Sequence, residues 1–262
     1  MADNCSDRIV LVTGATRGIG ESIAQVFQEA GATVLLHGRN RDRLEAVRQK
    51  LGLPASSTFV ADLRSVTEIE ALFAAIAANY PGLDILINNA GVSLSGSFLQ
   101  HSAEELRELL DINVRAVHLC CRQALPLMQA RGGGAIVNLS SNAASKPLPF
   151  LAAYSASKAA LEALSSSLRE ELAPYHIKVM AIAPGAVETE MSTQTDPEFA
   201  RQCNQDIIRL QPSAVAKAIL ALCQFAQIGN PKMLIFEHDA LAASPNHSST
   251  PVSTPQKGYP EG

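Results

Sequence analysis

The sequence predicts an α/β fold in which helices cover both faces of a single, doubly wound parallel sheet. Three observations lead to this prediction. Short apolar runs rich in β-branched residues alternate with segments of helical periodicity along most of the chain. The first such run, Ile9–Val12, leads directly into a glycine-rich turn and then into a helical segment. The length of 262 residues is enough to bury the core of one such domain, although length alone would also allow two.

Each expected strand is a short apolar run, and together they lie near 9–13, 33–37, 57–61, 84–88, 134–140, 177–182 and 232–236. The expected helices have apolar residues at helical spacing, and they lie near 18–30, 40–51, 66–78, 103–130, 152–174 and 213–226. This alternation implies right-handed crossovers and a sheet that is covered on both faces. We therefore expect one domain over 1–242, with a substrate lid at about 190–212. The Ser/Pro/Thr-rich segment 243–262 is expected to be a disordered tail.

Composition argues against several classes of function. The net charge is −4 and no basic cluster is present, so neither nucleic acid nor an anionic membrane is an expected partner. The sequence shows no apolar signal segment and no run as long as a membrane span. Five cysteines without CxxC spacing fit reduced thiols in a cytoplasmic protein. The six histidines are scattered and no metal-ligand cluster occurs, so no metal site is expected.

The turn after the first strand reads Thr13-Gly14-Ala15-Thr16-Arg17-Gly18-Ile19-Gly20. Its three glycines would let the turn tighten, let the backbone approach a pyrophosphate and let the next helix pack close to the strand. Free amides at the helix start would then face the phosphates. Such turns also reverse chains that bind nothing, but the order strand, turn, helix favours a dinucleotide site.

A second motif, Tyr154-Ser155-Ala156-Ser157-Lys158, begins a segment of good helix formers. Tyr154 and Lys158 should share one helical face, where a nearby ammonium would stabilise phenolate and lower the pKa of the tyrosine. The phenol could then donate a proton to a carbonyl oxygen or accept one from an alcohol. The structural alternative is a packed ring beside a solvated amine.

These two motifs, with Asn88-Asn89-Ala90-Gly91 after the fourth strand, resemble the short-chain dehydrogenase/reductase family and its 3-oxoacyl-ACP-reductase-like and tropinone-reductase-like branch. The glycine spacing is Gly-x3-Gly-x-Gly, and the resemblance runs from about Ile9 to Met191. It implies a Rossmann-type domain and reversible hydride transfer between a nicotinamide and a carbonyl carbon. The protein's own contribution would be orientation and electrostatics.

The resemblance also implies a catalytic set of Asn113, Ser141, Tyr154 and Lys158. The family's serine lies thirteen residues before the tyrosine, which selects Ser141 to hold the substrate oxygen, with Ser140 as the alternative in register. Asn113 falls mid-helix, where asparagine is unfavourable without a compensating contact. In the family it bends the helix and positions a water that joins Lys158 to a proton relay, and a helix bend without catalysis is the alternative.

The cofactor-binding set that the resemblance implies lies at the carboxyl ends of the strands: Gly14, Thr16, Arg17, Gly18, Ile19, Gly20, Arg39, Asp62, Leu63, Asn89, Ala90, Gly91, Tyr154, Lys158, Pro184, Gly185, Val187 and Thr189. Asp62 would accept from the adenine amino group, or would only cap or be solvated. Asn89 would border the adenine ribose or support the central strand.

Toward the other end of the cofactor, Lys158 would bind the nicotinamide ribose. Pro184 and Gly185 would pack on one face of the nicotinamide ring. The Val187 backbone and the Thr189 hydroxyl would hold the carboxamide.

Charge at the end of the second strand bears on cofactor choice. NAD-specific sites usually have an acidic residue there, whereas this chain reads Leu35-Leu36-His37-Gly38-Arg39-Asn40-Arg41. Arg39 could grip a 2′-phosphate with its guanidinium, and Arg17 would lie beside it. Arg41 is expected to be a solvated helix-start residue. We therefore predict NADP(H) rather than NAD(H).

The sequence thus predicts an NADP(H)-dependent oxidoreductase that reduces a ketone or a 3-oxoacyl substrate. The alternatives are a non-catalytic NADP(H)-binding regulatory protein of the same fold, which would not need Tyr154, and an isomerase or dehydratase, for which little room remains after Thr189. The expected partners are a small carbonyl or alcohol substrate and further copies of the chain. Wide apolar stripes on 103–130 and 152–174 suggest a homo-oligomer, either a dimer or a tetramer.

Overall fold

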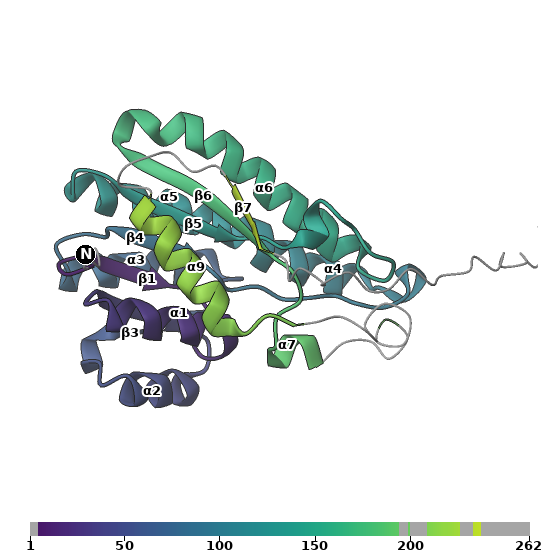
Figure 1. The fold of residues 1–262 in the computed structure, drawn as a ribbon, viewed down its shortest axis with the longest axis horizontal. Helices are drawn as coiled ribbons and strands as arrows, with labels where there is room; N and C mark the ends of the chain where they lie inside the picture. The colour runs from purple at the N-terminus through teal and green to yellow at the C-terminus, as the bar shows by residue number, and fades with distance from the viewer. Residues whose placement is uncertain (1–4, 194–198, 200–208, 226–232, 237–262) are drawn as a thin grey trace, which may run out of the picture.

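The structure, a computed structural model, describes residues 5–193, 199, 209–225 and 233–236. Its centre is a seven-stranded parallel sheet in the order β3-β2-β1-β4-β5-β6-β7 (Figure 1). The strands are β1 (Ile9–Val12), β2 (Thr33–Gly38), β3 (Thr58–Val60), β4 (Ile85–Asn88), β5 (Gly134–Leu139), β6 (Ile177–Pro184) and β7 (Met233–Phe236). The chain moves outward from β1 to β3 and then returns to pair β4 with β1 on its other side. The predicted doubly wound, parallel α/β fold is confirmed.

The helices are α1 (Gly18–Glu29), α2 (Arg41–Lys50), α3 (Val66–Asn79), α4 (Ala103–Leu110), α5 (Ala116–Ala130), α6 (Ala152–Leu172), α7 (Glu190–Thr193) and α9 (Pro212–Phe225). Short 3-10 turns occur at Ala55–Ser57, Phe98–Gln100, Asn142–Ala144 and Ala173–Tyr175. Each predicted strand and helix thus has a counterpart in the structure, with its ends shifted by a few residues.

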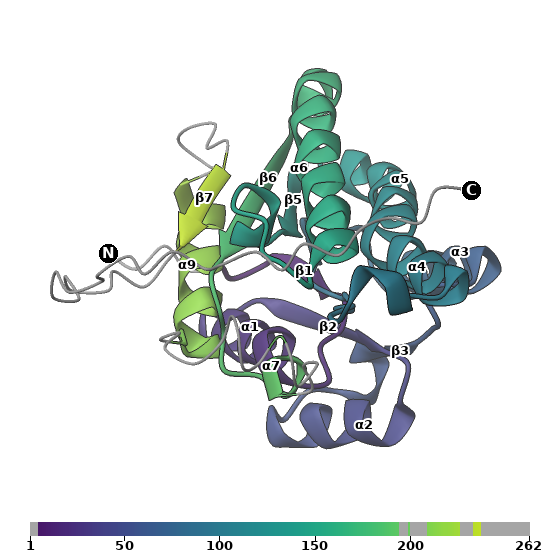
Figure 2. The same ribbon diagram turned by 90° about the vertical axis from the view of Figure 1, so that its right-hand side faces the viewer.

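Two hydrophobic layers hold the helices on the two faces of the sheet (Figure 2). Along β1, Val10 and Val12 face the layer that contains α1, α2 and α9, whereas Leu11 faces the layer that contains α3, α5 and α6. Successive side chains of a strand point to opposite faces, so a strand covered on both sides must be apolar throughout. This explains why the strands of this chain read as continuous apolar runs.

The predicted helix over 103–130 is wrong in one respect, because it is not a continuous α-helix. A π-helical turn, Asp111–Arg115, separates α4 from α5. Such a turn inserts one extra residue, leaves part of the regular hydrogen-bond ladder unmade, and often occurs at functional sites. Asn113 lies in the middle of this turn and is buried. Propensity alone cannot indicate such an insertion, because the flanking residues favour the α-helix on both sides.

Parts of the predicted domain organisation lie outside the described residues. Of the expected lid at 190–212, the described residues are 190–193, 199 and 209–212, and none of the expected tail at 243–262 is described. The division into one domain over 1–242 and a tail therefore stays a prediction. Among the residues that the structure describes, no helix is both long and apolar enough to cross a membrane.

Candidate functional site

A cavity of about 690 Å³ lies at the carboxyl ends of the strands, where the strand order reverses between β1 and β4. This reversal is where ligands bind in open α/β sheets. All the residues predicted to bind a cofactor line this cavity, and so does Ser141. Of the predicted catalytic residues, only Asn113 does not line it. Sequence positions separated by up to 175 residues, from Gly14 to Thr189, thus meet in one place.

The glycine turn is shaped by close backbone approach. Gly14 has a φ of +66°, which an L side chain rarely adopts. A Cβ atom at Gly20 would lie 2.2 Å from the Gly14 carbonyl oxygen, so α1 packs this close to the turn only because residue 20 is glycine. Arg17 precedes α1 and caps it with no side-chain hydrogen bond. The first amides of α1 therefore have no side-chain acceptor, which suits an anion.

Asn89 supports this turn from below. Its side-chain Nδ2 donates to the carbonyl oxygens of Thr13 at 2.8 Å and Gly14 at 3.1 Å, while its backbone amide donates to the Thr13 hydroxyl at 3.0 Å. Of the two roles that the sequence left open, the structure shows the support of the central strands. Asn89 also lines the cavity, so a contact with a ligand is compatible with this support.

Tyr154 and Lys158 project from the first turns of α6 into the cavity. The Lys158 ammonium lies 5.7 Å from the centre of the Tyr154 ring and donates to the Leu139 carbonyl oxygen at 2.7 Å. Burial lowers the pKa of Lys158 to about 8, because the charged form loses hydration. The Lys158 amine is therefore not the solvated amine of the structural alternative.

The predicted lowering of the Tyr154 pKa is wrong for the protein by itself. Burial of the phenol raises its pKa, and a hydrogen bond with Ser141 opposes that rise only in part. The loss of hydration is the larger cause and disfavours the phenolate. Tyr154 is consequently a phenol, with a proton to give, at neutral pH.

Ser141 rather than Ser140 faces the phenol. The Ser141 hydroxyl accepts from the Ala143 amide at 3.2 Å and is hydrogen-bonded to Tyr154. Ser140 turns toward α6, where its hydroxyl donates to Glu162 Oε1 at 2.8 Å. Ser140 and Ser141 directly follow β5, and although both line the cavity, only Ser141 is hydrogen-bonded to Tyr154, which decides the register.

Asn113 joins three segments behind the cavity. Its Oδ1 accepts from the Val92 amide at 2.9 Å, and its Nδ2 donates to the Val92 carbonyl oxygen at 2.9 Å and to the Ser157 hydroxyl at 3.1 Å. These bonds compensate for an asparagine inside a helix and fix the chain after β4 against α6. A Cβ atom at Gly91 would lie 3.2 Å from Asn113 Oδ1 and 3.7 Å from Lys158 Nζ. Asn113 is thus close to Lys158, while a proton relay through it stays a prediction.

At the opposite end of the cavity, Asp62 is occupied by Arg64. The Asp62 carboxylate accepts from the Arg64 backbone amide at 2.9 Å and from its guanidinium Nε at 3.0 Å. These bonds hold the pKa of Asp62 below its usual value. Asp62 thus closes a local turn with Arg64 and does not cap α3, whose N-cap is Ser65, and an adenine contact stays a prediction. Arg41, as expected, is exposed and does not line the cavity.

Sequence reasoning missed Arg43 and Glu190, both of which line the cavity. Arg43 lies in the first turn of α2, directly after the Arg39-Asn40 segment, and its place at the start of the helix that follows β2 could have indicated it. Asn40 caps α2 by accepting from the Arg43 amide at 2.9 Å. No sequence signal identifies Glu190, because its partners come from the glycine turn and from α2.

His37 is a third residue that sequence reasoning passed over. Its Nε2 lies 3.0 Å from the Ala61 carbonyl oxygen, and its Nδ1 accepts from the Gly14 amide at 3.4 Å. Burial lowers the pKa of His37 to about 4, so the ring is neutral near pH 7 and can donate at one nitrogen while accepting at the other. Through these two hydrogen bonds, His37 of β2 connects the residues that follow β1 and β3 at the base of the cavity.

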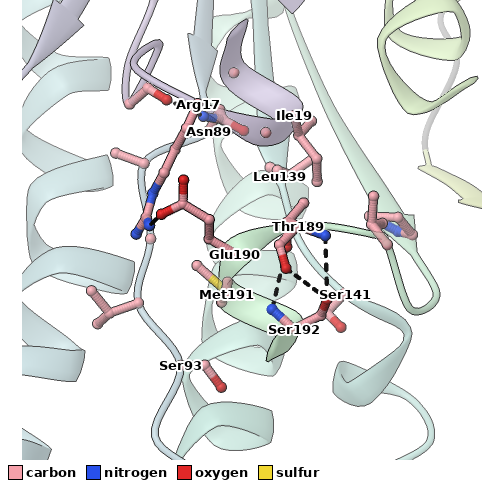
Figure 3. Close-up of a pocket in the computed structure, with 18 of the residues that line it drawn as sticks. Arg17, Ile19, Asn89, Ser93, Leu139, Ser141, Thr189, Glu190, Met191 and Ser192 are labelled. Carbon is pink, nitrogen blue, oxygen red and sulfur yellow. Dashed lines mark hydrogen bonds and ion pairs between the residues drawn. The ribbon is translucent and has the colours of Figure 1, made fainter. Parts of the chain in front are cut away.

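The loop after β6 forms the far wall. Pro184 ends the strand, and Val187 makes an isolated bridge to Leu210. Thr189 and Ser192 close a tight turn, in which the Thr189 amide donates to the Ser192 hydroxyl at 3.2 Å and that hydroxyl donates to the Thr189 carbonyl oxygen at 2.8 Å. Figure 3 shows this turn, with Glu190 reaching toward Arg17.

Within the described ranges, no group of three or more His, Cys, Asp or Glu side chains is placed to hold a metal ion. The described cysteines are buried and form no disulfide with one another: Cys5, Cys120, Cys121 and Cys223. Burial raises the pKa of Cys121 and of Cys223 to about 12, so these thiols are poor nucleophiles.

Comparison with known proteins agrees with this geometry. Residues 8–199 match the family model described as short chain dehydrogenase. An uncharacterized oxidoreductase of Staphylococcus aureus is 33% identical over 215 residues, which cover 82% of this chain and 90% of the relative.

Two solved structures are similar over most of their length. The 3-ketoacyl-(acyl-carrier-protein) reductase of Brucella melitensis, complexed with NADH, superposes with a TM-score of 0.79 at 30% identity and covers 89% of this chain and 98% of its own. L-sorbose reductase of Gluconobacter frateurii, complexed with NADPH and L-sorbose, gives a TM-score of 0.80 at 27% identity and covers 90% and 97%. The sheet, the cavity and the matched residues together establish that this chain is an oxidoreductase of the short-chain dehydrogenase family.

Proposed function

We propose that the protein is an NADP(H)-dependent oxidoreductase that interconverts a carbonyl and a secondary alcohol, acting as a reductase on a ketone or a 3-oxoacyl substrate. The observation that carries this proposal is the meeting of Tyr154, Ser141 and Lys158 in the cavity that also contains the glycine turn. A protein that only bound a dinucleotide would have no need for a phenol hydrogen-bonded to a serine at the nicotinamide end of the cavity.

The residues present fit a dinucleotide. The Gly14–Gly20 approach leaves room for phosphates against the backbone, and the first amides of α1 have no side-chain cap. The cavity volume of about 690 Å³ lies within the range of cofactor sites. The bound dinucleotide supplies or receives the hydride, and the remaining chemistry belongs to the protein.

In that chemistry Tyr154 donates its phenolic proton to the substrate oxygen during reduction and recovers a proton afterwards. Ser141 donates a hydrogen bond to the same oxygen and stabilises the charge that develops there. Lys158, held by the Leu139 carbonyl oxygen, keeps a positive charge beside the phenolate that forms, and it is placed to hold ribose hydroxyls. The raised pKa of Tyr154 suits the direction of reduction, because the acid is protonated before each turnover.

The choice of NADP(H) rests on charge at the adenosine end. Arg17, Arg39 and Arg43 line the cavity there, and no acidic residue follows β2 at the position that NAD-specific sites use. Guanidinium groups match a phosphate monoester in charge and in hydrogen-bond geometry. One related structure contains NADPH and another NADH, so the arginines of this chain carry the argument.

The substrate end of the cavity is mixed in character. Leu148, Leu151 and Met191 line it with apolar surface, while Ser93 adds a hydroxyl. A medium-sized, partly apolar ketone or a 3-oxoacyl thioester fits these walls. We also propose a cytoplasmic location, because the buried thiols of Cys120, Cys121 and Cys223 suit a reducing compartment. We further propose a homo-oligomer in the form of a dimer or a tetramer.

The decisive experiment is Tyr154→Phe with a panel of ketones and NADPH. Loss of the proton donor should lower kcat by about 10²–10⁴-fold while NADPH affinity changes little. Tyr175→Phe is the matched control, because Tyr175 is half exposed at the end of α6 and away from the cavity, and it should keep full activity. Retention of most activity by Tyr154→Phe contradicts the mechanism.

Cofactor choice is tested separately by kcat/KM for NADPH and NADH with the wild-type enzyme. A clear preference for NADPH supports the proposal, and a clear preference for NADH overturns this part of it. Tight NADPH binding without turnover of any ketone or alcohol would instead favour a non-catalytic binding protein.

A further inference from the structure

The first residue of α7 makes an unexpected contact with the basic end of the cavity. The Glu190 carboxylate forms an ion pair with the Arg17 guanidinium and lies 3.5 Å from Arg43 Nη1. Figure 3 shows the Glu190 side chain turned away from the rest of its loop and toward Arg17. Two of the three arginines at the proposed phosphate site are thus joined to a carboxylate of the same chain.

This contact is exposed enough to exchange with a ligand. The side chains of Arg17, Glu190 and Arg43 are 42%, 51% and 55% exposed, respectively. Ion pairs in such surroundings are screened by water and contribute little to stability. Arg17 holds the pKa of Glu190 below its usual value, so the carboxylate is charged at neutral pH and competes for the guanidinium groups.

We propose that Glu190 is a specificity-determining residue whose carboxylate occupies the place of the cofactor's 2′-phosphate and is displaced when that phosphate binds. The inference rests on the NADP(H) assignment above and deepens it. Glu190 sets how strongly a phosphorylated dinucleotide is favoured over an unphosphorylated one, because only the phosphorylated one competes with it.

The exchange follows from the charges involved. A carboxylate carries one negative charge on two oxygens, whereas a phosphate monoester carries about 1.5 to 2 charges on three oxygens and binds guanidinium groups more strongly. Once the phosphate is bound, a carboxylate at the same place would be repelled by it. A ligand without the 2′-phosphate leaves the contact between Glu190 and Arg17 intact.

The position of Glu190 links this exchange to the other end of the cofactor. Glu190 directly follows Thr189, whose hydroxyl and backbone form the turn with Ser192. Release of the carboxylate from Arg17 removes a tether between this turn and the glycine turn. Arrival of the 2′-phosphate therefore loosens the start of α7, next to the residue proposed to hold the nicotinamide carboxamide.

Binding of two cofactor fragments tests the proposal without turnover. Adenosine 2′,5′-bisphosphate contains the 2′-phosphate and ADP does not, and calorimetry gives the affinity of each for the wild type and Glu190→Gln. We expect the substitution to tighten bisphosphate binding by about threefold to tenfold and to leave ADP binding unchanged. Unchanged or weaker bisphosphate binding by Glu190→Gln overturns the proposal, since Glu190 would then be neutral or would hold the arginines in place for the ligand.

Glu21→Gln is the matched control. Glu21 borders a smaller cavity that also contains Arg17, Arg43 and Glu190, but its carboxylate pairs with Lys50 at 2.6 Å. The substitution removes the same charge from the same region without touching the arginines. An equal gain in bisphosphate binding by Glu21→Gln would mean that the loss of any negative charge in this region strengthens phosphate binding. That result would overturn the specific role of Glu190.

Amide hydrogen exchange provides a second readout. Neither fragment contains the nicotinamide, but a Cβ atom at Gly18 would lie 3.2 Å from Thr189 Cγ2, so Glu190→Gln serves to separate displacement of Glu190 from direct contact of a phosphate with this turn. In the wild type, exchange in the peptide that covers 189–193 should be faster with the bisphosphate than with ADP, and in Glu190→Gln the two ligands should give the same rate. Equal rates in the wild type contradict the displacement.

Failure of the NADP(H) assignment would look different. If the wild type and Glu190→Gln both bind ADP more tightly than the bisphosphate, the assignment itself is wrong and this inference falls with it. If the wild type prefers the bisphosphate but Glu190→Gln shows no gain, only the role of Glu190 is wrong.

Discussion

The two ends of the cavity treat charge in opposite ways. At the proposed adenosine end, Arg17, Arg43 and Glu190 keep 42–55% of their side-chain surface exposed. At the proposed catalytic end, Lys158 is only 5% exposed. Exposed charges remain hydrated, so little free energy is needed to form or break their ion pairs. They therefore suit the reversible binding of a ligand. A buried ammonium costs stability, but it acts strongly on a neighbouring phenol because little water screens it.

The two ends of the cavity also differ in which part of the chain shapes them. The turn at the adenosine end is formed by backbone, since Gly14 and Gly20 approach each other without side chains. The catalytic end is formed by side chains held by hydrogen bonds, such as Asn113 to Val92 and Ser157. Changes at the first end should therefore act through steric overlap, and changes at the second end through protonation and charge.

The largest expected effect tests the backbone approach. Gly20→Ala places a Cβ atom 2.2 Å from the Gly14 carbonyl oxygen, and a backbone atom cannot move aside without displacing the turn. We expect a loss of about 2–4 kcal/mol in the free energy of unfolding, together with loss of dinucleotide binding. Denaturant unfolding and calorimetry with NADPH check both.

Gly52→Ala is the control for this substitution. Gly52 has a φ of +64° but nothing within 4 Å of the added Cβ atom, so only the conformational cost of about 1–2 kcal/mol applies. Binding of NADPH should be unaffected. Equal binding by Gly20→Ala and Gly52→Ala would refute the steric account.

The next effect tests the buried cation. Lys158→Met should abolish turnover and yet raise the free energy of unfolding at pH 7, by about 3 kcal/mol at most. The pKa of Lys158 is about 8 in the folded protein, below its usual value of 10.5, so its charge opposes folding at pH 7. As pH rises from about 8 to 10.5, the folded protein loses this proton first, and the wild type regains stability.

Unfolding curves at pH 7 and at about pH 10.5 therefore decide whether burial of the charged Lys158 lowers the free energy of unfolding. The gap between the wild type and Lys158→Met should narrow at the higher pH. A variant that is less stable than the wild type at both values would show that the bond to Leu139 outweighs the burial of the charge.

A smaller effect concerns His37, the one buried titratable group described here at the adenosine end that has a strongly lowered pKa. Its pKa falls from 6.5 to about 4 on folding, so the unfolded chain binds a proton first as the medium is acidified. Stability from the neutral ring is complete above pH 6.5 and is lost as pH falls toward 4. Between pH 6.5 and 5 this should cost the wild type about 2 kcal/mol.

His37→Gln keeps an amide that can donate to the Ala61 carbonyl oxygen but does not titrate. Its stability should fall less steeply over the same pH interval. Parallel pH profiles for the wild type and His37→Gln would show that other groups cause the acid sensitivity.

The smallest effect compares two arginines of α2. Arg43→Gln should weaken binding of adenosine 2′,5′-bisphosphate by about threefold to tenfold, because Arg43 lines the cavity and its charge is largely screened. Arg41→Gln changes the same charge on the same helix but lies outside the cavity, and it should have less than a twofold effect. Similar losses in both variants would mean that net charge, rather than contact, draws in the phosphate.

The sequence predicted well those features that depend on residues close together in the chain. The strand runs, the glycine turn and the Tyr-x3-Lys spacing are local patterns. Each led to an element that the structure contains, and the residues of both motifs line the same cavity, while their roles there stay predictions. Ser141 was distinguished from Ser140 by its distance from Tyr154, and in the structure only Ser141 is hydrogen-bonded to Tyr154.

The predictions that failed or fell short depend on several segments at once. The sign of the Tyr154 pKa shift depends on how deeply β5, α6 and the loops bury the phenol, and no spacing encodes that depth. The π-helical turn around Asn113 is stabilised by Val92 and Ser157, two residues from other parts of the chain.

The sequence by itself determined the parallel fold and the family and supplied the proposal for the catalytic groups, because hydrophobic periodicity and close motif spacing act over a few residues. Only the tertiary structure decided which charges are buried, which acid meets Arg17, and where His37 fastens three strand ends together. Those outcomes follow from contacts between segments far apart in the chain, and both the desolvation of a group and the partners that it meets are properties of the packed molecule.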